Sequence, residues 1–163
     1  MTRDYDRIRA ELERAITPDM SRDERMQAFV DVLWPRLARD GVSWLGFYSR
    51  ADGAEEMILE ARRDKPACSP IGLHGACGQA CLTRTTLVVT DVKKLGEGYV
   101  ACDPRDQSEL VIPLFDDHGA CWGVYDADSF DVGSFDERDA EQVRELLIFS
   151  GLTTGAPVAI KVI

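Results

Sequence analysis

Residues 108–129, SELVIPLFDDHGACWGVYDADS, contain the pattern that decides the fold. The runs at 108–114 and 120–128 are rich in branched and aromatic residues, and the turn-forming residues DDHG separate them. Such a pattern is typical of two antiparallel strands joined by a short turn. Residues 42–49 and 55–61 form a second pair of this kind around the turn residues ADG. The sequence therefore predicts two β-hairpins, and the run TLVVT predicts a further strand.

Apolar residues at three- and four-residue intervals predict helices around these strands. Ser21 with Glu24, and Ser134 with Glu137, have the spacing of a capping box, which marks the start of a helix. We therefore expect an α+β fold in which an antiparallel sheet is flanked by helices. The final residues, 152–163, have no clear period and could be an added strand, an interface or a disordered end. The expected helices lie near residues 5–16, 22–40 and 137–147, with a brief helix at 75–83.

The net charge of the chain excludes some classes of binding partner. The chain has 163 residues, of which 19 are basic and 29 acidic, and its formal net charge is -10. This charge repels nucleic acid and anionic membranes, so we expect neither as a partner. The opening residues MTRDYDRIRAELER lack the apolar segment of a signal peptide, and no apolar run is long enough to span a bilayer. We expect a single cytoplasmic domain.

Five cysteines raise the question of thiol chemistry or metal binding, because a reducing compartment keeps structural disulfides from persisting. The segments 62–75 and 91–107 are irregular, and the cysteines in or beside them are Cys68, Cys77 and Cys102. There a thiol can be exposed and mobile. A nucleophilic Cys102 would need its thiolate form, which nearby cations favour. The cations near it in the sequence are Lys93, Lys94 and Arg105.

Cys121 differs from these three because it lies inside an apolar strand. Free cysteine is among the most buried residue types, so we interpret Cys121 as a small buried hydrophobic residue.

Acidic and aromatic residues on the predicted strands could form a pocket. Asp126 and Asp128 share one face because strand side chains alternate, and Glu109 lies on the neighbouring strand. Such carboxylates could bind an ammonium group, and one with a raised pKa could donate a proton. A solvated sheet edge is the alternative. Trp44 and Tyr48 also share a face, either for core packing or for a pocket.

Five fragments in this order resemble the free methionine-(R)-sulfoxide reductases, a family of GAF domains. They are WLGFY at 44–48, DKPAC at 64–68, GACG at 75–78, VACDPRDQSELVIPL at 100–114 and GVYDADS at 123–129. The resemblance runs from about residue 20 to residue 150. It implies a single GAF-like domain over 1–163, with an N-terminal helix in 1–19 and a tail at 152–163.

The resemblance implies a role for each of three cysteines. Cys102 matches the cysteine that attacks the sulfoxide sulfur and becomes a sulfenic acid, and Cys68 matches the resolving cysteine that forms a disulfide with it. Cys77 matches an auxiliary cysteine. A second thiol protects a sulfenic acid from irreversible oxidation. A thioredoxin-like dithiol would then reduce the disulfide, with no cofactor or metal, and the resemblance also implies a homodimer.

The resemblance assigns the substrate pocket as well. Trp44 and Tyr48 match aromatic residues around the methyl group of free methionine sulfoxide. Glu109, Asp126 and Asp128 match the acidic group that holds the amino group and assists protonation of the oxygen.

Two features depart from the family pattern. The segment between Cys68 and Cys77 is one residue shorter, and His74 stands where an arginine is usual.

Cys81 matches no family position and could be an alternative resolving thiol. The set Cys68, His74, Cys77 and Cys81 also offers zinc-type ligands, although without a clean CxxC pair. A zinc site would occupy the thiols that recycling needs.

A non-catalytic GAF sensor that binds a small molecule is the alternative of a different class. Such modules commonly adjoin an output domain, for which this chain has no room, so we expect the enzyme. Fold alone does not separate the two, because function resides in the site.

Overall fold

The computed structural model describes residues 2–97, 99 and 101–163. The predicted irregular segment 91–107 includes residues 98 and 100, which lie outside the described residues, and the family fragment 100–114 begins at one of them. None of the described helices has the length and apolar character needed to cross a membrane. The helices and strands are α1 (Tyr5–Ala15), α2 (Arg22–Leu37), η1 (Ala38–Asp40), β1 (Trp44–Ser49), β2 (Glu56–Arg63), β3 (Ile71–Gly72), α3 (Ala76–Thr83), β4 (Thr85–Val89), η2 (Val92–Leu95), β5 (Ser108–Phe115), β6 (Cys121–Ser129), α4 (Glu137–Phe149) and β7 (Ala159–Val162).

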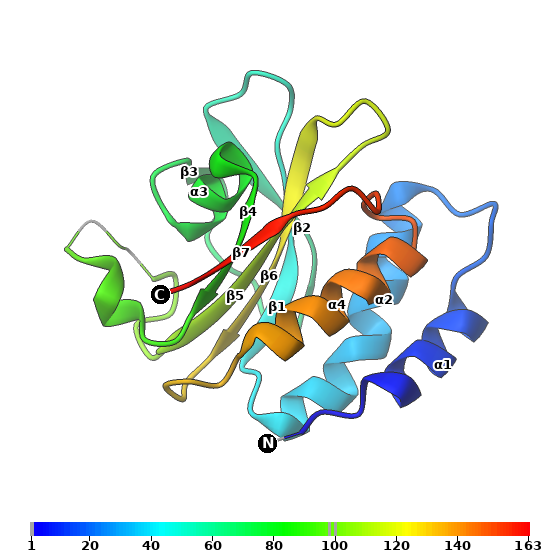
Figure 1. The fold of residues 1–163 in the computed structure, drawn as a ribbon, viewed down its shortest axis with the longest axis horizontal. Helices are drawn as coiled ribbons and strands as arrows, with labels where there is room; N and C mark the ends of the chain where they lie inside the picture. Colours follow the sequence, from blue (N-terminus) through cyan, green and yellow to red (C-terminus); the bar gives the residue numbers. More distant parts are fainter. Residues whose placement is uncertain (1, 98, 100) are drawn as a thin grey trace.

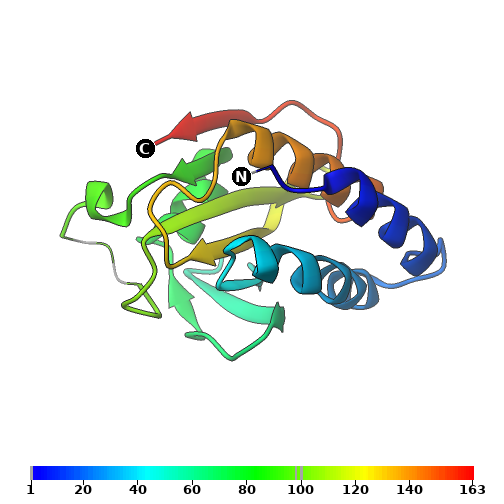
Figure 2. The same cartoon turned by 90° about the horizontal axis from the view of Figure 1, so that it is seen from below.

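The strands of the described residues form one seven-stranded sheet in the order β3-β2-β1-β6-β5-β4-β7. Both predicted hairpins are confirmed, because β1 pairs with β2 and β5 pairs with β6, each antiparallel. The tail becomes an added strand, β7, which runs parallel to β4 at the sheet edge (Figure 2). The α+β fold is therefore confirmed, but the sheet is mixed and not wholly antiparallel as expected.

The two faces of the sheet pack against different elements (Figure 1). Helices α1, α2 and α4 cover one face and bury the larger apolar cluster, which includes Phe29, Phe47 and Tyr125. Helix α3 covers part of the other face over a smaller cluster that contains Trp44, Tyr48 and Cys77. Alternate residues of one strand thus enter two different environments.

The helix starts are set by side chains that bind free backbone amides. The predicted capping box of Ser21 and Glu24 is confirmed at the start of α2. The one predicted at Ser134 and Glu137 is wrong, because Asp136 caps α4 and forms the box with Asp139. The Ser134 hydroxyl instead accepts a hydrogen bond of 3.0 Å from Arg3, a residue 131 positions earlier in the chain.

Candidate active site

Strand register brings the predicted acidic and aromatic residues together. Trp44 on β1 lies opposite Asp128 on β6, and Asp128 lies opposite Glu109 on β5. These three residues form a row across the sheet, on the face that α3 partly covers. Together with the loops after β2 and before β5, this face encloses a cavity of about 260 Å³. The predicted site residues that line it are Cys68, Cys77, Cys102, Trp44, Tyr48, Glu109, Asp126 and Asp128.

The aromatic pair forms one wall and also holds the loop that carries Cys68. The Trp44 and Tyr48 ring centroids lie 6.2 Å apart, at an interplanar angle of 37°. The Trp44 indole donates a hydrogen bond of 2.9 Å to the Lys65 carbonyl. The Tyr48 hydroxyl donates one of 2.8 Å to the Cys68 carbonyl. Both side chains are therefore fixed by polar contacts as well as by packing.

Gly46 leaves the space in which the Trp44 ring lies. A Cβ atom at residue 46 would lie 2.6 Å from Cη2 of Trp44 and 2.8 Å from Cβ of Arg62. Gly46→Ala should therefore displace the indole from the cavity wall. We expect it to lower the free energy of unfolding by roughly 1–3 kcal/mol, as measured by urea unfolding. Gly155→Ala is the control, because a Cβ there meets no atom within 4 Å and the residue lies outside the cavity; equal losses in both variants would contradict the role of the Trp44 contact.

The carboxyl groups on the cavity floor hold their protons unusually well. Burial raises the pKa of Glu109 to about 7. Burial, followed by the neighbouring charges of Asp128 and Glu109, raises the pKa of Asp126 well above its ordinary value. Burial and the charge of Glu109 raise the pKa of Asp128 in the same way. The group therefore shares protons near neutral pH and can both bind a cation and donate a proton.

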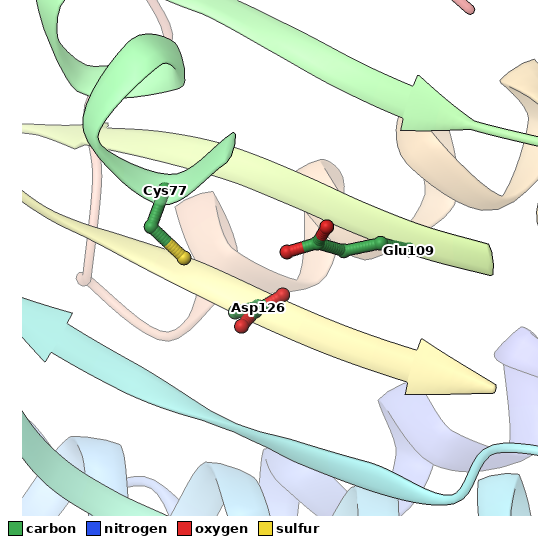
Figure 3. A group of neighbouring side chains, drawn as sticks. All are labelled: Cys77, Glu109 and Asp126. Atoms are coloured by element: carbon green, nitrogen blue, oxygen red, sulfur yellow. The ribbon is translucent and has the colours of Figure 1, made fainter. Parts of the chain in front are cut away.

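Cys77 reaches this floor from the start of α3 (Figure 3). Its sulfur and carboxylate oxygens of Glu109 and Asp126 all lie within 4.8 Å of one another. Burial and the adjacent carboxylates raise the pKa of the Cys77 thiol well above its ordinary value. These three groups could surround a cation, but their raised pKa values favour protonated forms, which are poor metal ligands.

The structure does not gather the four residues that were considered from the sequence as an alternative zinc ligand set. Cys68, His74 and Cys77 line the cavity, but the fourth predicted ligand, Cys81, does not. Its sulfur lies instead beside that of Cys121, 2.7 Å away. The same placement takes Cys81 away from Cys102 and argues against its use as an alternative resolving thiol.

Cys102 and Cys68 both open on the cavity, and both are exposed. Partial burial, followed by a hydrogen bond with the Cys68 thiol, raises the pKa of Cys102 to about 12. The charge of Asp128 contributes in the same direction. Cys102 therefore holds its proton near neutral pH, and negative charge in the cavity disfavours its ionisation.

The three cations considered from the sequence as possible helpers of a Cys102 thiolate have other partners or lie on the surface. Arg105 binds Asp103, with a nitrogen–oxygen distance of 2.7 Å. The Lys94 ammonium donates a hydrogen bond of 2.9 Å to the Thr90 hydroxyl. The neighbouring Lys93 lies on the exposed surface of η2. The pKa of Cys102 is raised, whereas these cations were expected to lower it.

Two residues of the cavity were missed from the sequence. Asp106 is buried, and this burial raises its pKa to about 6. Tyr99 donates a hydrogen bond of 3.2 Å from its hydroxyl to Oε2 of Glu109. Both residues lie in the irregular stretch before β5, where no periodicity shows which side chains turn inward. Their proximity to Cys102 in the chain was the one available signal.

Comparison with known proteins places the chain in a family. A family model described as GAF domain matches residues 19–147. The chain belongs to the GAF-domain family. The free methionine-R-sulfoxide reductase of Saccharomyces cerevisiae is 37% identical to this GAF domain over 107 residues, which are 64% of this chain and 59% of the relative. GAF domain-containing protein A of Dictyostelium discoideum is 38% identical over 105 residues, 64% of this chain and 65% of the relative.

A solved structure resembles the GAF domain over most of its length. It is the free methionine-R-sulfoxide reductase from Neisseria meningitidis in complex with its substrate, with a TM-score of 0.80 and 32% identity. The match covers 90% of this chain and 85% of that one. The chain spans about 59–65% of the length of the first two curated relatives. One of these two relatives is named only for its GAF domain. The comparisons therefore show the family, and the activity of this chain has to be inferred from the residues of the cavity.

Proposed function

We propose that this GAF domain, acting over residues 1–163, reduces free methionine-(R)-sulfoxide to methionine with its own cysteines. The observation that carries the proposal is the shared cavity, in which the Cys102 and Cys68 thiols face a floor of proton-holding carboxyl groups. The relatives named as free methionine-R-sulfoxide reductases support the same substrate for this chain. The preference for the R epimer is inferred from that likeness.

The cavity suits a small zwitterion with an apolar end. Glu109, Asp126 and Asp128 offer carboxylate oxygens to an ammonium group, and an ammonium ion would lower their raised pKa values. Trp44 and Tyr48 offer aromatic surface to the methyl group at the other end. This arrangement would hold the sulfoxide sulfur between the acidic floor and Cys102.

In the first step, Cys102 attacks the sulfoxide sulfur while a carboxyl group on the floor protonates the sulfoxide oxygen. The Cys102 thiol proton passes to a neighbouring carboxylate, for which Asp128 is the candidate. In the adduct that results, the hydroxyl group passes from the substrate sulfur to the Cys102 sulfur. The sulfur–oxygen bond of the substrate and the transient bond between the two sulfur atoms break, methionine leaves with the electron pair, and Cys102 becomes a sulfenic acid. Atoms balance, because the oxygen lost by the sulfoxide is the oxygen gained by Cys102.

In the second step, the Cys68 thiol attacks the sulfur of the sulfenic acid, releases water and forms the Cys68–Cys102 disulfide. Cys68 is exposed and lines the same cavity as Cys102. Cys77 is buried and protonated beneath them, and we propose it as the auxiliary thiol. A thioredoxin-like dithiol would reduce the disulfide by exchange. This cycle needs a reducing compartment such as the cytoplasm, and a homodimer remains the proposed assembly.

The test is thioredoxin-coupled NADPH oxidation with the separate R and S epimers of free methionine sulfoxide. We expect turnover of the R epimer and its loss in Cys102→Ser, whereas the control Cys121→Ser, outside the cavity, should retain it. A folded, reduced protein that binds the R epimer without turning it over would overturn the enzyme and favour the GAF sensor.

Blocking the amino group of the substrate should reveal the function of the acidic floor. N-acetylmethionine-(R)-sulfoxide lacks the ammonium charge, so its kcat/KM should fall by about 100-fold relative to the free amino acid. The methyl ester, which keeps the ammonium group and loses the carboxylate, is the matched comparison. Equal rates for the free and acetylated substrates would contradict ammonium binding by the carboxyl groups.

A further inference from the structure

Two cysteines lie outside the cavity of the proposed active site and close to each other. Cys81 is on α3, Cys121 begins β6, and their sulfur atoms lie 2.7 Å apart. Both are free thiols. A disulfide bond is about 2.05 Å long, so only a small movement separates this pair from a covalent link. The sequence interpretation of Cys121 as a small buried hydrophobic residue is only partly confirmed. Cys121 packs against the smaller apolar cluster, but it is half-buried and its sulfur lies beside a second thiol.

The pair opens on a surface cleft of its own. The cleft has a volume of about 340 Å³ and lies beside the turn between β5 and β6. Its charged groups are two basic and two acidic side chains, which leaves it without a strong preference for either sign. They are Arg50, Arg84, Asp52 and Asp116. Both cysteines line this cleft, but Cys81 is only 3% exposed and Cys121 is half-buried. A small disulfide therefore has to enter the cleft to reach the Cys81 sulfur, but it does not have to enter the proposed active site.

We propose that Cys81 and Cys121 form a second redox centre, a dithiol that small disulfide molecules oxidise to an intramolecular disulfide. The two thiols have different parts in this reaction. The hydrogen bond between Cys81 and Cys121, together with the charges of Arg50 and Arg84, lowers the pKa of Cys81 to about 7 despite its burial. The same hydrogen bond raises the pKa of Cys121. The pair therefore ionises first at Cys81, which makes Cys81 the attacking sulfur.

The reaction is a balanced thiol–disulfide exchange. The Cys81 thiolate attacks one sulfur of a disulfide RSSR, forms a mixed disulfide with it and expels RS⁻. This removes the negative charge that held the proton on Cys121, so the pKa of Cys121 falls. The Cys121 thiolate then attacks the Cys81 sulfur and expels the second RS⁻. Overall, two protein thiols lose two electrons and two protons, and RSSR becomes two RSH.

The product would connect two elements that also serve the active site. Helix α3 carries Cys77 as well as Cys81, and β6 carries Asp126 as well as Cys121. A Cys81–Cys121 bond would join α3 to β6 on the side away from Cys102. The centre is nevertheless chemically separate, because neither thiol lines the cavity of Cys68 and Cys102.

The experiment removes the proposed active-site thiols with the triple variant Cys68→Ser/Cys77→Ser/Cys102→Ser. After circular dichroism confirms its fold, the reduced protein is equilibrated with mixtures of glutathione and glutathione disulfide, alkylated and mapped by mass spectrometry. We expect one intramolecular disulfide that joins Cys81 and Cys121 and is fully reversed by excess glutathione. A folded triple variant that keeps both thiols free under oxidising mixtures would overturn the proposal. Because this protein lacks Cys102, the result is independent of the proposed reductase activity.

One further substitution in the triple variant distinguishes the attacking thiol, Cys81, from the resolving thiol, Cys121. Adding Cys121→Ser should stop the reaction at a glutathione adduct on Cys81. Adding Cys81→Ser should instead slow modification of Cys121 by about 10-fold or more, since no thiolate remains to attack. Equally fast modification of Cys121 without Cys81 would contradict the order of attack. If the triple variant does not fold, the same adduct test in the single variant Cys121→Ser, compared with the unmodified chain, decides the question.

Discussion

Cys68→Ser is expected to yield a protein that reduces a single equivalent of methionine-(R)-sulfoxide per chain and then stops. Cys102 keeps its access to the cavity in this variant, so the first oxygen transfer should proceed. In this variant the sulfenic acid has lost the exposed thiol that shares its cavity. Cys77 is a poor substitute, because burial and two carboxylates hold its proton. Steady-state turnover should therefore fall by at least about 100-fold.

Rapid-quench measurement of methionine formed per chain checks this result, and a sulfenic-acid reagent such as dimedone should label Cys102. The control is Cys121→Ser, a cysteine-to-serine change outside the cavity, which should keep full turnover and take no label. Undiminished turnover in Cys68→Ser would mean that another thiol resolves the sulfenic acid, and Cys68 would lose its proposed role.

Glu109→Gln should make the protein more stable and much less active. Burial raises the pKa of Glu109 from 4.5 to about 7. Below pH 4.5 Glu109 is protonated in both the folded and the unfolded state, so its ionisation does not affect the free energy of unfolding. Between pH 4.5 and 7 the unfolded state releases its proton first, and the stability of the wild-type chain falls as the pH rises. Above pH 7 Glu109 is ionised in both states, and burying its charge lowers the free energy of unfolding by the full amount, roughly 3 kcal/mol.

Glutamine has no charge to bury and can still accept the hydrogen bond of Tyr99. Urea unfolding at pH 5.5 and pH 8 should therefore show the larger gain in stability for Glu109→Gln at pH 8. Its kcat/KM should fall by about 100-fold, since it neither attracts an ammonium group nor donates a carboxyl proton. A gain that is the same at both pH values, or larger at pH 5.5, would contradict the assigned burial of the charge.

Strand periodicity made much of the fold and site predictable. Alternation along 120–128 correctly placed Asp126 and Asp128 on one face, and the neighbouring hairpin strand supplied Glu109. The parallel pairing of β7 with β4 was not predictable, because it joins segments about 70 residues apart with no local signal. The predicted capping residue of α4 was wrong for the same reason, since Ser134 accepts a hydrogen bond from Arg3, which is distant in the chain.

The electrostatics of the site were the least predictable part. Nearby cations in the sequence favoured a Cys102 thiolate, yet Arg105 turns to Asp103 and the cavity places carboxylates near the thiol. Loop conformation decides both placements, and it has no period that could be read from the residues. The close approach of Cys81 to Cys121 was also not predictable from the sequence, because Cys81 lies on a helix and Cys121 on a strand 40 residues away.

The division of the sheet into two faces has a practical consequence for protein engineering. On β6, Val124 lies on the side of the cavity, whereas Tyr125 and Ala127 pack under the three helices. A library confined to cavity-side positions could therefore alter which oxidised thioether is accepted while the opposite face keeps the scaffold intact. Randomising successive positions along the same strand would mix the two effects and fill the library with unfolded members. Selection for new substrates should therefore sample every second residue of β1, β5 and β6.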